Sequence, residues 1–329
     1  MSKPFKSIDE QITLLRSRGM TIEDDGMARH ALETVSYYRL SGYSYPFREY
    51  SPEDAPECRS NHFVPGTSFD QIIRLYNFDT QLRFTVFEEL SKIEVSLRAM
   101  IGYQIGAADP LLHMNPSSLN ERAWNADEQK ERRLYKDWQY HYENSLKNSK
   151  EIFVQHHLEN YGGTLPIWCA VHILDWGSLQ TLFTMLPKEM RRQIAAKLQL
   201  TPSVLDSWLN CLRVIRNISA HHSRLFNRSL PNIPTIPHSA KEIGIMGLSQ
   251  AKNKCFDQLT LVQYLTRTMG LGDGTALPSV LAAFPATDVV PLRATGTPDN
   301  WQSLPLWACD TLRRIDAPDT PSDGQLTCC

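Results

Sequence analysis

The sequence predicts an all-α protein, and three features of the 329-residue chain lead to that prediction. Apolar residues recur at helical spacing along most of the chain, and no alternation of apolar and polar residues is long enough to require a sheet. Glycine and proline divide the chain into segments of helical length. We expect an N-terminal helical region at 1–66, a helical core at 67–270, and a partly irregular C-terminal extension at 271–329.

Capping residues and helix breakers predict the first two helices. Ser7 followed by Glu10 forms a capping box for a helix that Gly19 ends. A second helix is expected at about 25–40, and it should end in the segment YYRLSGYSYP, where Gly42 interrupts the helical pattern.

The middle of the chain should hold the longest helix. Residues 51–68 have the composition of a loop, and a helix is expected from about Ser68 to Met100. Its apolar side chains cover much of the circumference, so it should be buried on several sides. Residues 103–123 are expected to form a connection, and 124–158 have a polar, helix-compatible pattern.

Proline marks the starts of several later helices. Pro166, Pro187 and Pro202 each stand where a helix can begin, because the first helical position tolerates a missing N–H. Four helices are expected, at about 166–186, 187–200, 203–226 and 250–269. Beyond Gly270 the helical pattern weakens, but the indoles of Trp301 and Trp307 would be costly to leave exposed, so part of the extension should dock on the body.

Composition excludes several classes of protein. The net charge is -2, with 34 basic and 36 acidic residues, so the overall charge does not by itself indicate a nucleic-acid binder. The seven cysteines include no CxxC pair, which argues against a disulfide framework and a structural zinc site. The N-terminus lacks the apolar core of a signal peptide, and no stretch could span a membrane. We therefore expect a cytoplasmic protein with no membrane association.

A polar stripe runs along the expected helix at 203–226 and its continuation. On a helical wheel at about 100° per residue, seven polar residues follow one another at steps of three and four. They are Asp206, Asn210, Arg213, Asn217, His221, Arg224 and Arg228. An ordinary solvated face is the common explanation for such a stripe, but that face is normally rich in Lys and Glu, and this one has neither. Amide, imidazole and guanidinium groups instead favour phosphate recognition and proton transfer.

The stripe and its neighbours could support cleavage of RNA without a metal. That reaction needs a proton acceptor and donor, and a group that stabilises the extra negative charge on phosphorus. We predict His221 as the acid and base, Arg216 as the phosphate clamp, and Asn217 as a residue that orients His221 or binds a phosphate oxygen. Arg216 and His221 lie roughly 140° apart on an ideal helix. Both reach one phosphate only if the helix bends, if the Arg216 side chain extends around it, or if two subunits contribute.

Four charged residues form a second candidate group on the long helix at 68–100. Asp79, Arg83, Glu94 and Arg98 fall within an arc of roughly 100°, among apolar residues. The favoured interpretation is that Glu94 and Arg98 form an i,i+4 ion pair that braces the bundle. The alternative is that a carboxylate here orients His221 or Arg216.

Further basic residues are candidates for RNA contacts. Arg132, Arg133 and Lys136 lie among aromatic residues, a pattern divided about evenly between RNA binding and a solvated helix. The residues around the histidine pair complete the predicted RNA-binding set, which adds Arg213, His222, Arg224 and Arg228. Adjacent histidines point about 100° apart on a helix and have no acidic partner at ligand spacing, so we expect no metal. The sequence contains no motif typical of cofactor binding, so we expect no cofactor.

Six segments of the chain carry a family resemblance. They are DEQITLLRSRGM, YYRLSGYSYPFR, FDTQLR, IEVSLR, SWLNCLRVIRNISAHHSRLFNR and WQSLPLW. In this order they resemble the Abi family of abortive-infection proteins, of the AbiD/AbiF type. The spacing of Arg216 and His221 is also similar to the Arg-x(4 to 6)-His motif of the HEPN ribonucleases.

The resemblance implies a fold and an activity. It implies a HEPN-like helical bundle at 67–270 and a metal-independent endoribonuclease, which works as a homodimer with two Arg/His sets facing one cleft. It also implies phage defence through damage to RNA, and association with a structured noncoding RNA. The alternative is a non-catalytic RNA-binding protein that holds a noncoding or antitoxin RNA, and a third class is a helical toxin that acts on a protein partner.

Overall fold

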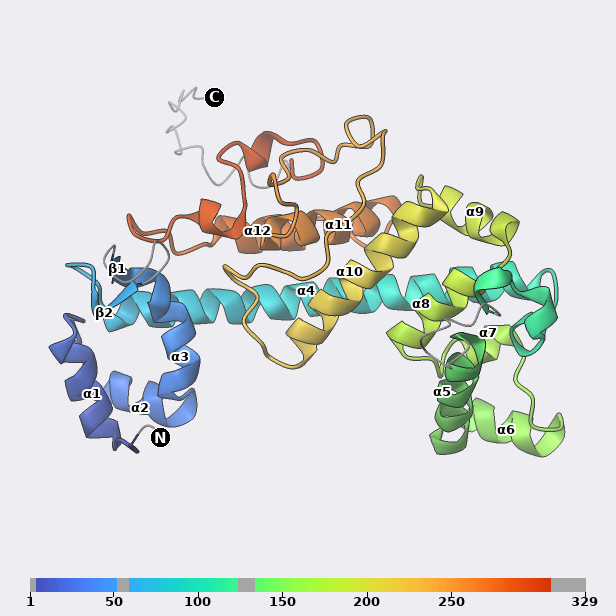
Figure 1. Ribbon diagram of the computed structural model, residues 1–329, viewed down its shortest axis with the longest axis horizontal. Helices are drawn as coiled ribbons and strands as arrows, with labels where there is room; N and C mark the ends of the chain where they lie inside the picture. Colours follow the sequence, from blue (N-terminus) through green and yellow to red (C-terminus); the bar gives the residue numbers. More distant parts are fainter. Residues whose placement is uncertain (1–3, 52–58, 124–133, 309–329) are drawn as a thin grey trace, which may run out of the picture.

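A computed structural model describes residues 4–51, 59–123 and 134–308. Within these ranges the chain forms twelve α-helices, six short 3-10 helices and one two-stranded sheet, which confirms the predicted, mostly all-α fold. One helix, α4 (Phe69–Gly106), runs the length of the molecule (Figure 1). Helices α1 to α3 lie at one end of α4 and α5 to α9 at the other, while α10 crosses it and α11 and α12 lie along it.

The N-terminal region differs from its prediction at one turn. Helix α1 (Ile8–Ser17) has the predicted capping box at Ser7. The helix expected at 25–40 is two helices, α2 (Asp25–Thr34) and α3 (Tyr37–Ser44), because Ser36 between them has a φ of 77°. A positive φ cannot continue a right-handed helix. The break turns α3 so that it packs against α4.

A small sheet occupies part of the segment that was expected to be a loop. Strands β1 (Arg48–Tyr50) and β2 (Arg59–Phe63) pair antiparallel. They are three and five residues long, and Phe63 is the only residue of either strand that is buried. Strands this short and this exposed have no alternating pattern that the sequence could reveal.

Helix α4 is longer than predicted because two of its glycines serve packing. The helix begins after the capping residue Ser68 and continues past Met100 to Gly106. A Cβ at Gly102 would lie 3.1 Å from a Val171 side-chain carbon, and one at Gly106 would lie 2.8 Å from the Trp168 ring. These glycines therefore allow the segment around α7 to approach α4 closely.

The remaining helices include shorter versions of those predicted, a division of the segment 124–158 into α5 and α6 within its described part, and α12, which was not predicted. They are α5 (Leu134–Asn148), α6 (Ile152–Asn160), α7 (Ile167–Ala170), α8 (Trp176–Met185), α9 (Lys188–Ala196), α10 (Pro202–Ala220), α11 (Cys255–Thr268) and α12 (Ala276–Ala282). The 3-10 helices are Tyr45–Phe47, Leu112–Met114, Pro116–Ser118, Glu121–Ala123, Leu292–Thr295 and Trp301–Ser303. The single helix expected at 166–186 is divided into α7 and α8, and Asp175 caps α8 by accepting a 2.6 Å hydrogen bond from the Ser178 amide.

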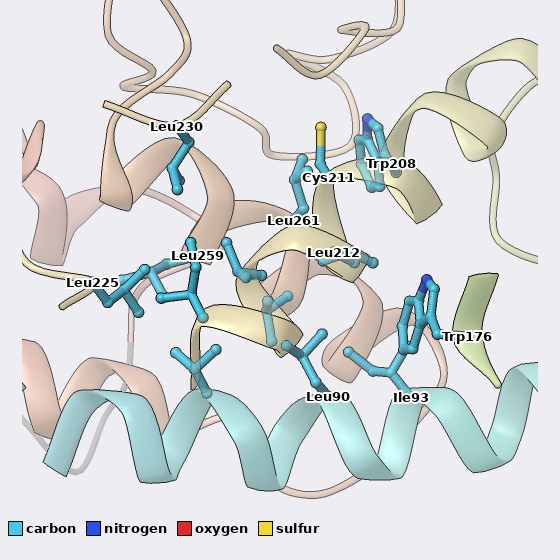
Figure 2. Packing of buried hydrophobic residues seen from close by; sticks show 14 of the residues in the cluster. Leu90, Ile93, Trp176, Trp208, Cys211, Leu212, Leu225, Leu230, Leu259 and Leu261 are labelled. Atoms are coloured by element: carbon cyan, nitrogen blue, oxygen red, sulfur yellow. The ribbon is translucent and has the colours of Figure 1, made fainter. Parts of the chain in front are cut away.

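The centre of the core lies where α10 crosses α4. Figure 2 shows Leu90 and Ile93 of α4 directed toward Leu212 of α10 and Leu259 of α11. All four side chains are buried, so this crossing fixes the position of α10 against the long helix.

The described part of the C-terminal extension, which ends at residue 308, packs on this body. Trp307 is fully buried and stacks on Phe256 of α11 with ring centroids 4.7 Å apart, and Trp301 packs edge-on against Trp307. Within the described ranges, no helix has the length and apolar character needed to cross a bilayer.

A buried histidine lies where the connection after α4 meets α5. His113 is fully buried, and its ring packs edge-on against Trp138 and Tyr142. Burial lowers the pKa of His113 to about 4, against a small opposing effect of the Asp109 charge. Neither ring nitrogen has a hydrogen-bond partner among the described residues.

This histidine should make the stability depend on pH. Because the folded pKa is depressed, the unfolded chain binds a proton between about pH 6.5 and pH 4 that the folded chain does not bind. We expect stability on the order of 3 kcal/mol to be lost as the pH falls through this window. Chemical unfolding of His113→Leu should show a flatter pH dependence over the same range. The exposed His30 provides the control, and equal slopes for the wild type and His113→Leu would contradict the prediction.

Candidate functional site

Helix α10 carries the predicted site and ends earlier than the sequence suggested. Thr201 caps its start, and its last residue is Ala220. His221 is the C-cap, its side chain is exposed, and its amide donates a 3.0 Å hydrogen bond to the Asn217 carbonyl. His222 then has a φ of 55°, which ends the right-handed helix. The prediction of a helix to 226 was therefore wrong, and Arg224 and Arg228 do not continue the polar stripe.

Arg216 leans against α4 rather than toward His221. Its Nε lies 3.7 Å from Glu94 Oε2, and its guanidinium lies 5.9 Å from the centre of the Phe87 ring. About a third of its side chain, 35%, stays accessible to solvent. Among the described residues, no contact joins Arg216 to His221, in agreement with their separation on the helical wheel.

Glu94 is shared by two arginines. Its other carboxylate oxygen accepts a 2.5 Å hydrogen bond from Arg98, which also donates to the Leu174 carbonyl at 2.8 Å. Both interpretations of Glu94 therefore describe real contacts, since it pairs with Arg98 within α4 and also lies beside Arg216 of α10. One carboxylate between two guanidinium groups leaves a net positive charge, which suits an anion such as phosphate.

The loop after α10 is held by α3 through two arginines. Arg39 donates to the carbonyl of His222, and Arg224 donates to the carbonyl of Gly42. A Cβ at Gly42 would lie 3.7 Å from the Arg224 guanidinium, an ordinary van der Waals contact, so this approach does not require glycine. Gly42 lies inside α3 and does not end it, which corrects its predicted role as a helix breaker.

Asp79 fixes the same loop from α4. Its fully buried carboxylate accepts from the backbone amides of Leu225, at 3.2 Å, and Phe226, at 2.6 Å. The Tyr43 hydroxyl donates to it at 2.6 Å, and Arg83 forms an ion pair with it. Burial, and then the Asp79 charge, raise the pKa of Tyr43.

The four charged residues predicted on α4 therefore act as two separate pairs. Asp79, paired with Arg83, holds the loop that follows His221. Glu94, paired with Arg98, lies beside Arg216. Sequence reasoning missed Arg39 and Tyr43 as partners of the loop. The resemblance to the Abi family included the segment that holds both residues, but a resemblance does not identify a contact.

The remaining residues of the predicted stripe have different surroundings. Asp206 accepts from Thr184 at 2.7 Å and pairs with Arg191 at 3.4 Å, so it joins α10 to α8 and α9. Arg213 donates to Asn210 on the preceding turn of α10 at 3.0 Å. Asn217 is half-buried, and His222 and Arg228 are exposed.

In the described part of the predicted basic and aromatic segment, the basic residue is exposed and most of the aromatic residues are buried. Arg132 and Arg133 lie outside the described residues, and Lys136 is exposed on α5. Tyr135 and Trp138 are buried in the α5 packing and cannot stack on a base. Across the ranges that the structure covers, no three His, Cys, Asp or Glu side chains gather closely enough to hold a metal ion.

The fold and site define a helical protein in which α10, the helix that carries Arg216 and ends at His221, is anchored to the long helix α4. A family model described as Abi-like protein matches residues 30–227, which is more than half of the chain. The chain therefore belongs to the Abi-like protein family, and this membership suggests a role in abortive infection, a form of phage defence. The matched range includes α4, α10 and the loop that Asp79 holds. Comparison with curated proteins and with solved structures found no match.

Proposed function

We propose that this protein is a metal-independent endoribonuclease of the HEPN type that acts in abortive infection. The observation that supports the proposal most directly is the position of Arg216 and His221 on α10. Arg216 is braced against α4 with part of its guanidinium exposed, while His221 is exposed at the end of the same helix. One helix therefore carries both a guanidinium that can bind a phosphate and an imidazole that can exchange protons.

The proposed reaction is a transesterification within the RNA. The 2′-oxygen loses its proton and attacks the adjacent phosphorus, the bond from phosphorus to the 5′-oxygen breaks, and that oxygen receives a proton. The products are a 2′,3′-cyclic phosphate and a 5′-hydroxyl. His221 exchanges the protons, Arg216 stabilises the charge that develops on the phosphate oxygens, and Asn217 orients His221 or binds a phosphate oxygen.

We further propose that the working unit is a homodimer. Arg216 is directed to α4 and His221 to solvent, so pairing two α10 ends across a two-fold axis would bring the arginine of one subunit toward the histidine of the other. Like charges would then repel unless apolar contacts offset them. Two exposed apolar side chains of α4 are suited to that contact: Phe87, 37% exposed and beside Arg216, and Phe84, 57% exposed and three residues before Phe87.

Incubation of the purified protein with total RNA in EDTA tests the proposed chemistry. We expect cleavage to continue, because no metal-bound water is needed, and the new 3′ ends to carry 2′,3′-cyclic phosphates. Sequencing of the RNA ends, with and without prior removal of cyclic phosphates, measures the extent of cleavage and the chemical nature of the new 3′ ends. Cleavage that stops in EDTA and returns with Mg²⁺ would indicate a metal nuclease. Tight binding without cleavage would instead favour the alternative, a protein that holds a noncoding or antitoxin RNA.

A further inference from the structure

A polar pocket of about 420 Å³ lies beside α10, where α5, α8 and α10 meet. Helix α8 packs against both of the others (Figure 1). The side chains that give the pocket its chemistry are Asp137, His141, Asp175, Thr181, Asn210 and Arg213. This volume is within the range of small-molecule sites, roughly 300–1,000 Å³.

Two charged side chains of the pocket, Arg213 and Asp137, form no ion pair with any residue that the structure describes. Arg213 donates to Asn210 Oδ1 and forms no ion pair with another described residue, although two carboxylates line the same pocket. Asp175 caps α8, and Asp137 makes no hydrogen bond or ion pair to any other residue in the described part of the chain. A ligand that presents acceptors to Arg213 and donors to Asp137 would satisfy both charges.

The floor of the pocket is rigid. Trp138 is buried, and its indole N–H donates a 3.0 Å hydrogen bond to the Ser178 carbonyl, which ties α5 to α8. Trp138 also stacks on Tyr142 with ring planes 3° apart. The polar groups of α5 are therefore held at a fixed place relative to α8, and a ligand need not order them.

We propose that this pocket binds one guanine base of the RNA, an inference that rests on the proposed ribonuclease function. Guanine presents two acceptors, O6 and N7, which an arginine can bind together. Its N1–H and its amino group are adjacent donors, which a carboxylate such as Asp137 can accept. Adenine has no acceptor at the position of O6, and the pyrimidines have no N7, so neither matches both sides of the pocket as well.

The pocket is connected to the proposed catalytic residue by α10 itself. Arg213 and His221 are eight residues apart, or about 12 Å along the helix axis, with Asn217 between them. An RNA strand that follows this line would place one of its phosphates near His221 when its guanine occupies the pocket. The pocket would thereby select which bond is cut.

Binding of mononucleotides to the full chain tests the proposal directly. Titration with GMP, AMP, CMP and UMP, followed by calorimetry, holds the phosphate and ribose constant and compares the bases. We expect GMP to bind at least roughly tenfold more tightly than the other three. Asp137→Asn should remove most of that preference, and Arg213→Ala should weaken GMP binding. Glu143→Gln, at an exposed carboxylate farther along α5 that does not line the pocket, is the matched control and should leave it unchanged.

The outcomes separate this proposal from the proposed function. Equal binding of the four nucleotides would overturn guanine recognition, and a GMP preference that survives in a folded Asp137→Asn protein would overturn its assignment to this pocket. Either result leaves ribonuclease activity open to its own test. Selective GMP binding by a protein that cuts no RNA would support the pocket and reject the ribonuclease. Thermal melting of each variant shows whether it is folded.

Discussion

Replacement of Arg216 or of His221 by alanine is expected to abolish RNA cleavage and to leave the fold intact. Loss of a general acid and base typically lowers a rate by about 10²–10⁴-fold, and loss of one charge-stabilising donor by about 10²–10³-fold. Neither change should unfold the protein, since His221 is exposed, Arg216 is partly exposed, and Glu94 keeps its ion pair with Arg98 when Arg216 is removed. Initial cleavage rates and thermal melting measure the two effects.

His222 provides the matched control for the histidine. It adjoins His221 and is equally exposed, while its carbonyl, not its ring, accepts from Arg39. His222→Ala should therefore keep most of the activity. Cleavage at the wild-type rate by either Arg216→Ala or His221→Ala would mean that the catalytic assignment is wrong.

The same two variants test the homodimer. If each site combines Arg216 of one subunit with His221 of the other, a mixed dimer of Arg216→Ala and His221→Ala subunits retains one intact site. Mixing the inactive proteins should then restore partial activity. A wild-type protein that light scattering shows to be monomeric while it cleaves at the full rate would exclude the composite site.

Local signals explain the part of the fold that the sequence predicts. The capping box at Ser7 and the capping residue Ser68 lie where the sequence placed them, because a cap depends only on residues within one turn. The long helix continues past its predicted end near Met100 through Gly102 and Gly106, where the segment around α7 packs closely against it. A close approach of this kind depends on tertiary contacts, which a single sequence does not display.

The candidate site shows the same division. The helical wheel correctly separates Arg216 from His221, and the charge pattern on α4 correctly draws attention to Glu94. The wheel cannot show that Asp79 bonds to backbone amides at 225 and 226, because every residue carries such amides and sequence pattern identifies none of them. Nor can it place the end of α10, which depends on the positive φ of His222.

Asp79→Ala is expected to have the largest effect on stability of any single change at the site. It would leave the Arg83 guanidinium buried without its partner and would remove the acceptor for the amides of Leu225 and Phe226. Removing one partner of a buried ion pair typically costs about 3–5 kcal/mol. At roughly 2–4 °C per kcal/mol, the melting temperature should fall by on the order of 10 °C.

Asp70→Ala is the control that distinguishes the effect of burying an ion pair from the effect of the ion pair itself. Asp70 forms the same kind of i,i+4 pair, with Arg74 on the same helix, but both side chains are more than half exposed. Water therefore solvates whichever partner remains, and we expect a loss of about 1 kcal/mol or less. Hydrogen exchange adds a local test. The amides of Leu225 and Phe226 should exchange faster in Asp79→Ala, and their exchange rates should be unchanged in Asp70→Ala. Equal melting temperatures for the two variants would contradict the role of Asp79, since the loop after His221 would then be held by other contacts.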